Sequence, residues 1–116
     1  MKTIKMTNQE VLNNANNIGG IMDFRLPVKV SYALNKNRKA ILEVRNCFLE
    51  EYTKLQQEYP GGGDELENKC KELLSIENDV PVHTVEESLL KEANHDLSLN
   101  VFIALEFMLE EQTNEQ

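Results

Sequence analysis

One stretch of the sequence constrains the fold more than any other. After Pro27, neither proline nor glycine occurs until Pro60. Apolar residues recur through this stretch at steps of three, four or seven, the spacing of one helix face. They are Val30, Leu34, Ile41, Val44, Phe48, Tyr52, Leu55 and Tyr59, and Asn37 fills the one gap between them. The pattern predicts a single long helix over residues 27–59, with Pro27 in its first turn.

Such a helix would be about 50 Å long at a rise of 1.5 Å per residue. A chain of 116 residues has the length of one domain, and the helix would exceed the diameter of that domain. We therefore expect part of the helix to project or to pair with another chain. The sequence predicts a homodimer or a higher homo-oligomer.

A capping box opens a short helix before the long one. The Thr7 hydroxyl can accept from the amide of Glu10, and the Glu10 side chain can reach back. A helix should therefore run over residues 8–18. Gly19 and Gly20 should end it, because glycine adopts the left-handed cap conformation without strain.

A glycine-rich break over residues 60–63 separates the long helix from the rest of the chain. Further helices are predicted from Asp64 to residues 78–79, from a capping box at 84–87 to a break at 94–96, and from Ser98 to about Glu111. The last is apolar on most of its circumference, which indicates burial on several sides. Residues 80–85 are β-branched and could form a short extended segment, which Pro81 limits to an edge or a loop. The predicted fold is all-α, with residues 1–116 in a single helical domain.

The charges divide the chain into two halves. Residues 1–49 carry eight basic and three acidic side chains, and residues 50–116 carry four basic and 17 acidic ones. The net charge of −8 disfavours direct binding to duplex DNA, whose backbone is itself anionic.

The basic residues suggest a candidate anion-binding patch. Lys36 and Lys39 are three residues apart and share a helix face, and Arg38 lies off to one side. With Arg45, they could bind a phosphate or a small nucleotide. Alternatively, these charges face the acidic helices of the same chain and form a solvated rim of weak ion pairs.

The acidic half suggests a second candidate surface. Carboxylates at Glu86, Glu87 and Glu92 could occupy a basic groove on a partner protein and accelerate the encounter with it.

Catalytic and metal-binding patterns are incomplete. Paired glutamates occur at residues 50–51 and 86–87, as in all-helical nucleotide pyrophosphatases, which hold Mg²⁺ between two helices. Lys54 and Leu90 stand where a further carboxylate should complete each set. The two histidines are far apart and have no nucleophile at a telling distance. We therefore expect no catalytic residue, no metal site and no cofactor.

Cysteine usage and hydropathy indicate the compartment. Cys47 and Cys70 stand at helical positions among apolar neighbours, which predicts two reduced core thiols in a cytosolic protein. No apolar run approaches the roughly 18 residues that a membrane span requires, and the first residues lack the apolar core of a secretory signal.

Part of the chain resembles small uncharacterised phage and prophage proteins. The resemblance rests on a Pro-Val-Lys start, a Lys-Asn-Arg step and a long charged helix that ends in tyrosine. It covers residues 25–38, the later Glu50, Glu51, Tyr52 and Tyr59, the Val80-Pro81-Val82 segment and residues 105–108. It implies a phage or prophage origin and expression in the bacterial cytoplasm, but no particular activity.

These features lead to one hypothesis with two alternatives. The chain is predicted to be a non-enzymatic phage or prophage interaction protein. It would inhibit a bacterial defence system by binding a defence protein or by sequestering a nucleotide signal. The first alternative is a structural or assembly accessory of the phage particle. The second is an all-α enzyme that hydrolyses nucleotides.

Overall fold

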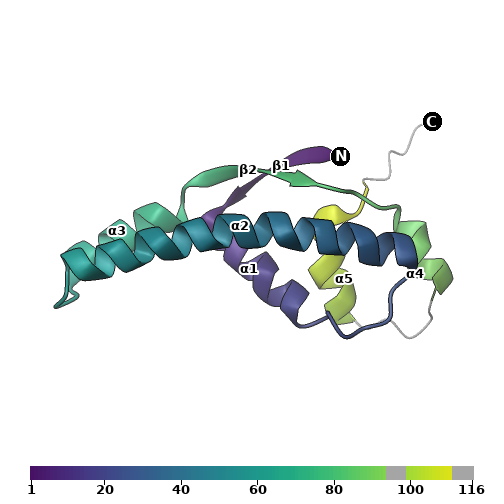
Figure 1. Cartoon of the computed structure of the whole chain (residues 1–116), viewed down its shortest axis with the longest axis horizontal. Helices are drawn as coiled ribbons and strands as arrows, with labels where there is room; N and C mark the ends of the chain where they lie inside the picture. Colours follow the sequence, from purple (N-terminus) through teal and green to yellow (C-terminus); the bar gives the residue numbers. More distant parts are fainter. Residues whose placement is uncertain (94–98, 111–116) are drawn as a thin grey trace.

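The long helix dominates the computed structural model, which describes residues 1–93 and 99–110, except for the side chains of 91–93. The elements are β1 (Lys2–Thr7), α1 (Asn8–Gly19), α2 (Val28–Glu58), α3 (Asp64–Leu74), β2 (Glu77–Val82), α4 (Glu87–Ala93), α5 (Leu99–Leu105) and the 3₁₀ turn η1 (Glu106–Met108). The prediction of one long helix is confirmed, since α2 has 31 residues. Pro27 precedes it as the N-cap. Figure 1 shows α2 running the length of the molecule.

The all-α prediction is wrong, because the two ends of the chain's first 82 residues form a sheet. β1 and β2 pair antiparallel, with Lys2 opposite Val82 and Thr7 opposite Glu77. Burial alternates along both strands, so that Met6 and Val80 face the core while their neighbours are exposed. This alternation is the physical signature of a strand with one covered face.

The expected extended segment near residues 80–85 overlaps the end of β2, which begins at Glu77. Pro81 sits inside this strand, opposite Thr3. In a sheet of two strands each strand has an unpaired side, and this is the setting in which proline is tolerated.

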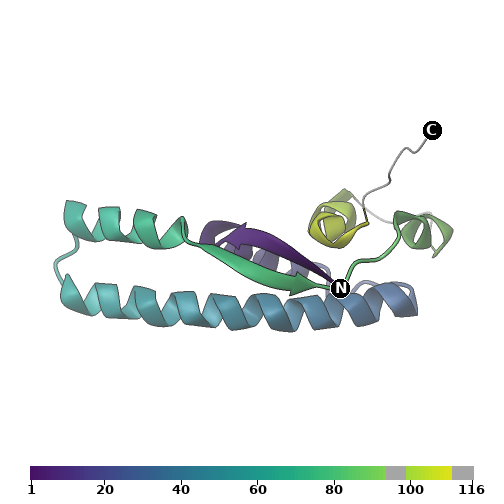
Figure 2. The ribbon, with the colours of Figure 1, turned by 90° about the horizontal axis from the view of Figure 1, so that it is seen from above.

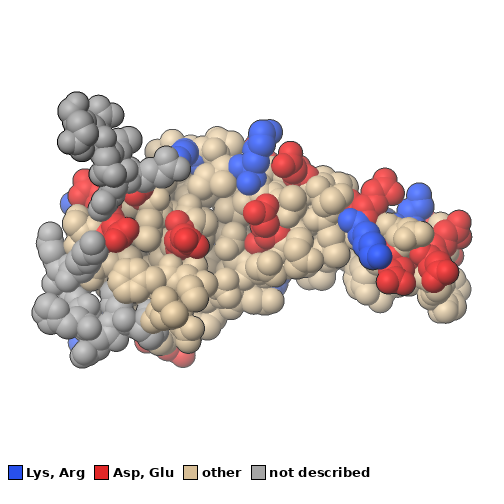
Figure 3. All heavy atoms as spheres, turned by 180° about the vertical axis from the view of Figure 1, so that it is seen from behind, with Lys and Arg blue, Asp and Glu red and all other residues tan. Residues whose placement is uncertain are grey.

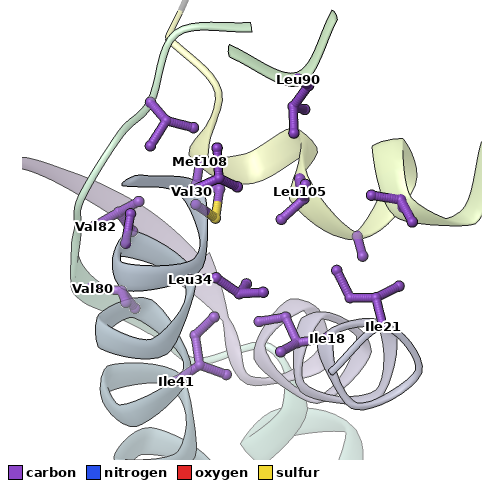
Figure 4. Close-up of a cluster of buried hydrophobic side chains, with 14 of the residues drawn as sticks. Ile18, Ile21, Val30, Leu34, Ile41, Val80, Val82, Leu90, Leu105 and Met108 are labelled. Carbon is purple, nitrogen blue, oxygen red and sulfur yellow. The ribbon is translucent and has the colours of Figure 1, made fainter. Parts of the chain in front are cut away.

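The core lies between the N-terminal half of α2, α1, the sheet and α5. Figure 4 shows Ile18 of α1, Leu34 and Ile41 of α2, and Leu105 of α5 pointing toward one another. Val80 and Val82 of β2 and Met108 of η1 close the cluster, and all three are fully buried. Each such side chain contributes roughly 1.5–3 kcal/mol by leaving water.

The C-terminal part of α2 projects beyond this core. We call the part of α2 after Phe48, together with α3, the α2–α3 arm. Figure 2 shows its two helices side by side at one end of the molecule. No residue of α3 is fully buried, and the molecule measures 53 × 35 × 21 Å. The expected projection of the long helix is therefore present, and α3 runs alongside it.

Two buried asparagines connect elements that are distant in sequence. Asn37 fills the gap in the apolar stripe of α2, and its side chain is fully buried. Its Nδ2 donates to the His83 carbonyl oxygen at 2.9 Å, and its Oδ1 accepts from the His83 amide at 2.7 Å. Asn8 donates through Nδ2 to the Leu73 carbonyl oxygen at 2.8 Å and accepts from Asn78 Nδ2 at 2.9 Å. These amides hold α2 to the end of β2, and α1 to the last turn of α3.

The capping predictions had mixed outcomes. The box at Thr7 and Glu10 is confirmed, with the two reciprocal hydrogen bonds at 3.1 and 2.8 Å. Gly20 ends α1 in a right-handed conformation, at φ −73°, so the left-handed cap is wrong. Thr84 does not open α4, which begins at Glu87. The Thr84 hydroxyl instead faces Glu110 at 3.4 Å, because the backbone of Val85 pairs with the segment after η1.

Two further predictions need correction. Cys47 is exposed and Cys70 is half-buried, so neither thiol belongs to the core. The last helix is not buried on several sides, because Leu99 is 73% and Ile103 49% exposed. The break at 94–96, the cap at Ser98 and the end at Glu111 lie outside the described residues.

Candidate interaction surface

The connection between α1 and α2 displays apolar side chains to solvent. Ile21 is buried and anchors the connection. Its amide donates to the Ile18 carbonyl oxygen at 3.0 Å, and the Phe24 amide donates to the Ile21 carbonyl oxygen at 3.1 Å. This tight path leaves the side chains of Met22 and Phe24 partly exposed, at 42% and 44%.

These side chains border an open pocket of about 440 Å³, which we call the α1–α2 pocket. Its walls come from the connection and from the first two turns of α2. They comprise Ile21, Met22, Phe24, Leu26, Val28, Ser31, Tyr32, Leu34 and Asn35. Val28 and Tyr32 are strongly exposed. Single exposed apolar residues are ordinary, but a contiguous group around a concave site is typical of a protein-binding surface.

Cationic side chains lie next to the pocket. The Lys36 Nζ stands 5.5 Å from the centroid of the Tyr32 ring, within the range of a cation–π contact. Lys39 is exposed and follows Tyr32 by seven residues, so both lie on one face of α2. Arg25 is exposed in the connection itself. Together they give the apolar site a positively charged margin.

The four predicted anion-binding residues do not form one cluster. Lys36 and Lys39 share the outer face of α2 with Tyr32. Arg38 and Arg45 are seven residues apart and share a different side of the helix, where both are half-buried. The Arg45 Nε is buried without a hydrogen-bond partner among the described residues. The single patch predicted from the sequence is therefore divided into two pairs.

The predicted acidic surface lies at the same end of the molecule. Glu86 borders a second open pocket of about 360 Å³, together with Glu110, His83 and Lys29. Glu87 is half-buried at the start of α4, and Glu92 lies outside the described side chains. Opposite charges thus line one pocket, which differs from the uniformly acidic surface expected from sequence.

Within the described residues, no group of three His, Cys, Asp or Glu side chains is arranged to hold a metal ion. Over the same residues, no helix combines the length and the apolar character that a membrane crossing needs.

The α1–α2 pocket was not predicted from the sequence. A signal for it exists between Gly20 and Pro27, where apolar Met22, Phe24 and Leu26 occur in a segment too short for a helix. Apolar residues in a connection must either reach the core or stay in water, and here only some reach the core.

Comparisons of the chain with family models, with curated proteins and with solved structures find no match.

Proposed function

We propose that this chain is a non-enzymatic interaction protein that binds a partner protein through the α1–α2 pocket. The single observation that carries the proposal is the group of exposed apolar side chains around that pocket. Aromatic and methionine side chains are enriched in the centres of protein interfaces. An aromatic anchor in a concave site is typical of the few residues that dominate binding energy.

The cationic margin adds a preference for the partner's charge. Lys36, Lys39 and Arg25 would favour a partner surface with an apolar centre and acidic residues around it. Such complementarity mainly accelerates the encounter and selects the partner. The division of Lys36 and Lys39 from Arg38 and Arg45 argues against a site that encloses a small nucleotide, because a phosphate needs converging donors.

The resemblance to phage and prophage proteins suggests the setting. In the bacterial cytoplasm, the bound partner would be a defence protein, which the chain would inhibit by stoichiometric binding. A partner from the phage particle would instead identify an assembly accessory.

The test compares two variants in bacteria that carry a panel of defence systems. Phe24→Glu places a charge at the centre of the pocket surface, and Leu49→Glu is the matched control. Phe24 and Leu49 are similarly exposed, at 44% and 43%, but Leu49 lies outside the pocket lining. We expect the unaltered chain and Leu49→Glu to raise phage plating on at least one defence strain. Phe24→Glu should lose this effect.

Native mass spectrometry of the chain isolated from the same cells gives the second readout. A defence protein bound in fixed stoichiometry to the unaltered chain and absent from Phe24→Glu supports the proposal. Equal retention by both variants would remove the pocket from the binding surface. A phage structural protein in that complex would replace the inhibitor function with the assembly function.

A further inference from the structure

The solvent-facing side of α1 consists of side-chain amides. Gln9, Asn13, Asn16 and Asn17 repeat at helical spacing, and all four are exposed. We call them the amide stripe. Gln9 Nε2 donates to Asn13 Oδ1 at 3.2 Å, so the stripe is partly ordered within the chain. Asparagine is a poor helix former, which makes four surface amides an unfavourable choice for an ordinary solvated helix face.

The surface beside the stripe is apolar and uncharged. α1 contacts α5, whose Leu99 and Ile103 are exposed. A small pocket of about 180 Å³ lies between the two helices, bordered by Asn16, Asn17, Asn100 and Ile103. Residues 11–22 and 99–105 contain no charged residue.

The figures place this region on the molecule. In Figure 1, α1 and α5 lie below α2. Figure 3 shows the opposite side, where coloured charges crowd the α2–α3 arm and a broad area in the lower middle carries none. Depletion of charge is the compositional mark of an interface centre.

The net charge restricts how two copies of this chain can approach each other. Each copy carries −8, so contact between charged surfaces is opposed by repulsion. The uncharged region of α1 and α5 is a place where two copies can meet without bringing like charges together.

We propose that the amide stripe and the exposed apolar residues of α5 form the docking surface for a second copy of this chain. The two α1 helices would cross a twofold axis in antiparallel orientation. A twofold interface must be complementary to itself. Carboxamides satisfy this condition because each carries both donors and an acceptor, whereas a stripe of lysines or glutamates would face its own charge.

The available area is sufficient. A stable interface buries about 800 Å² on each partner, which is about one tenth of the 7996 Å² surface of this chain. α1 has 12 residues and α5 has seven, and their outer faces adjoin the exposed Met22.

This surface differs from the one expected from the sequence. The predicted oligomer rested on the apolar stripe of α2, but Val30, Leu34 and Ile41 are buried by elements of the same chain. The free surface therefore lies on α1, away from the stripe of α2.

The test uses sedimentation velocity on the full chain at about 100 μM, far above a micromolar Kd. Asn13→Glu places one charge at the centre of the amide stripe. The matched control is Asn46→Glu, at an exposed asparagine of α2. We expect the unaltered chain and Asn46→Glu to be dimers, and Asn13→Glu to raise the dimer Kd about tenfold or more.

A mixing experiment separates an interface from a folding defect. Asn13→Glu and Asn13→Lys should each dissociate alone and should form a mixed dimer when combined, because the charges then attract across the axis. A monomeric unaltered chain, equal dissociation of Asn13→Glu and Asn46→Glu, or failure of the mixture to associate would each overturn the proposal. A neutral partner protein bound by the monomer would replace the second copy.

Phe24→Glu should leave the dimer intact, because Phe24 borders a different pocket. Loss of partner binding and loss of dimerisation are therefore separate outcomes.

Discussion

At the scale of single residues, Asn37 shows what position in a pattern can and cannot predict. The helical spacing of α2 places this residue on the buried stripe. Nothing in the spacing identifies its partner, the backbone of His83, which is 46 residues away. A buried amide needs its hydrogen bonds, so the sequence predicts that a partner exists, and only the tertiary fold determines which one it is.

We expect Asn37→Leu to lower the free energy of unfolding by about 2–4 kcal/mol, because both backbone groups of His83 would lose their partner. Urea unfolding followed by circular dichroism measures the loss. Asn46→Leu, at an exposed site of the same helix, should change stability by less than about 0.5 kcal/mol. Equal effects of the two substitutions would show that Asn37 is an ordinary helix position.

At the scale of elements, the long-range periodicity of α2 was easier to interpret than short segments. Eight apolar residues define α2, whereas β1 contains only two inward-facing residues, Ile4 and Met6. A strand of this length becomes recognisable through its partner, and here the partner β2 is about 70 residues later. The capping box of α1 was predictable because all of its atoms lie within four consecutive residues.

The break between α2 and α3 gives a prediction at this scale. Gly63 has φ +101° and ψ −175° as the N-cap of α3, a region that is essentially restricted to glycine. Gly63→Ala should therefore destabilise α3 by about 1–3 kcal/mol. Faster hydrogen exchange of the α3 amides would report this loss.

Gly61→Ala is the matched control for that break. Gly61 does not have a positive φ, and no atom lies within 4 Å of an added Cβ. Exchange in α3 should stay unchanged or slow slightly, because alanine reduces the freedom of the unfolded chain. If both variants exchange alike, the backbone at Gly63 is not strained by a side chain.

At the scale of the whole molecule, the two-part charge distribution of the sequence acquires a geometry. The acidic half contributes the α2–α3 arm, and the basic half contributes the margin of the α1–α2 pocket. The sequence could not predict the uncharged region between them, because it is assembled from α1 and α5, which are about 80 residues apart. The candidate site was missed for a similar reason, since its walls come from a connection and a helix that were considered separately.

Self-association through the uncharged region should respond to salt in a particular direction. Added salt screens the repulsion between two copies of charge −8 and removes no favourable ion pair from the proposed interface. We expect the dimer Kd to fall as the NaCl concentration is raised, as measured by sedimentation. A Kd that rises with salt would indicate that ion pairs between copies hold the dimer together.

The pairing of β1 with β2 also has a consequence for synthesis of the chain. Lys2–Thr7 leaves the ribosome first, but its partner Glu77–Val82 is translated more than a minute fraction of the chain later, after α1, α2 and α3. Met6 and Val11 thus wait for Val80 and Leu105 before the interior can close. Pairing across such a separation is slow compared with local helix formation, so the nascent N-terminus is the segment on which a chaperone would act.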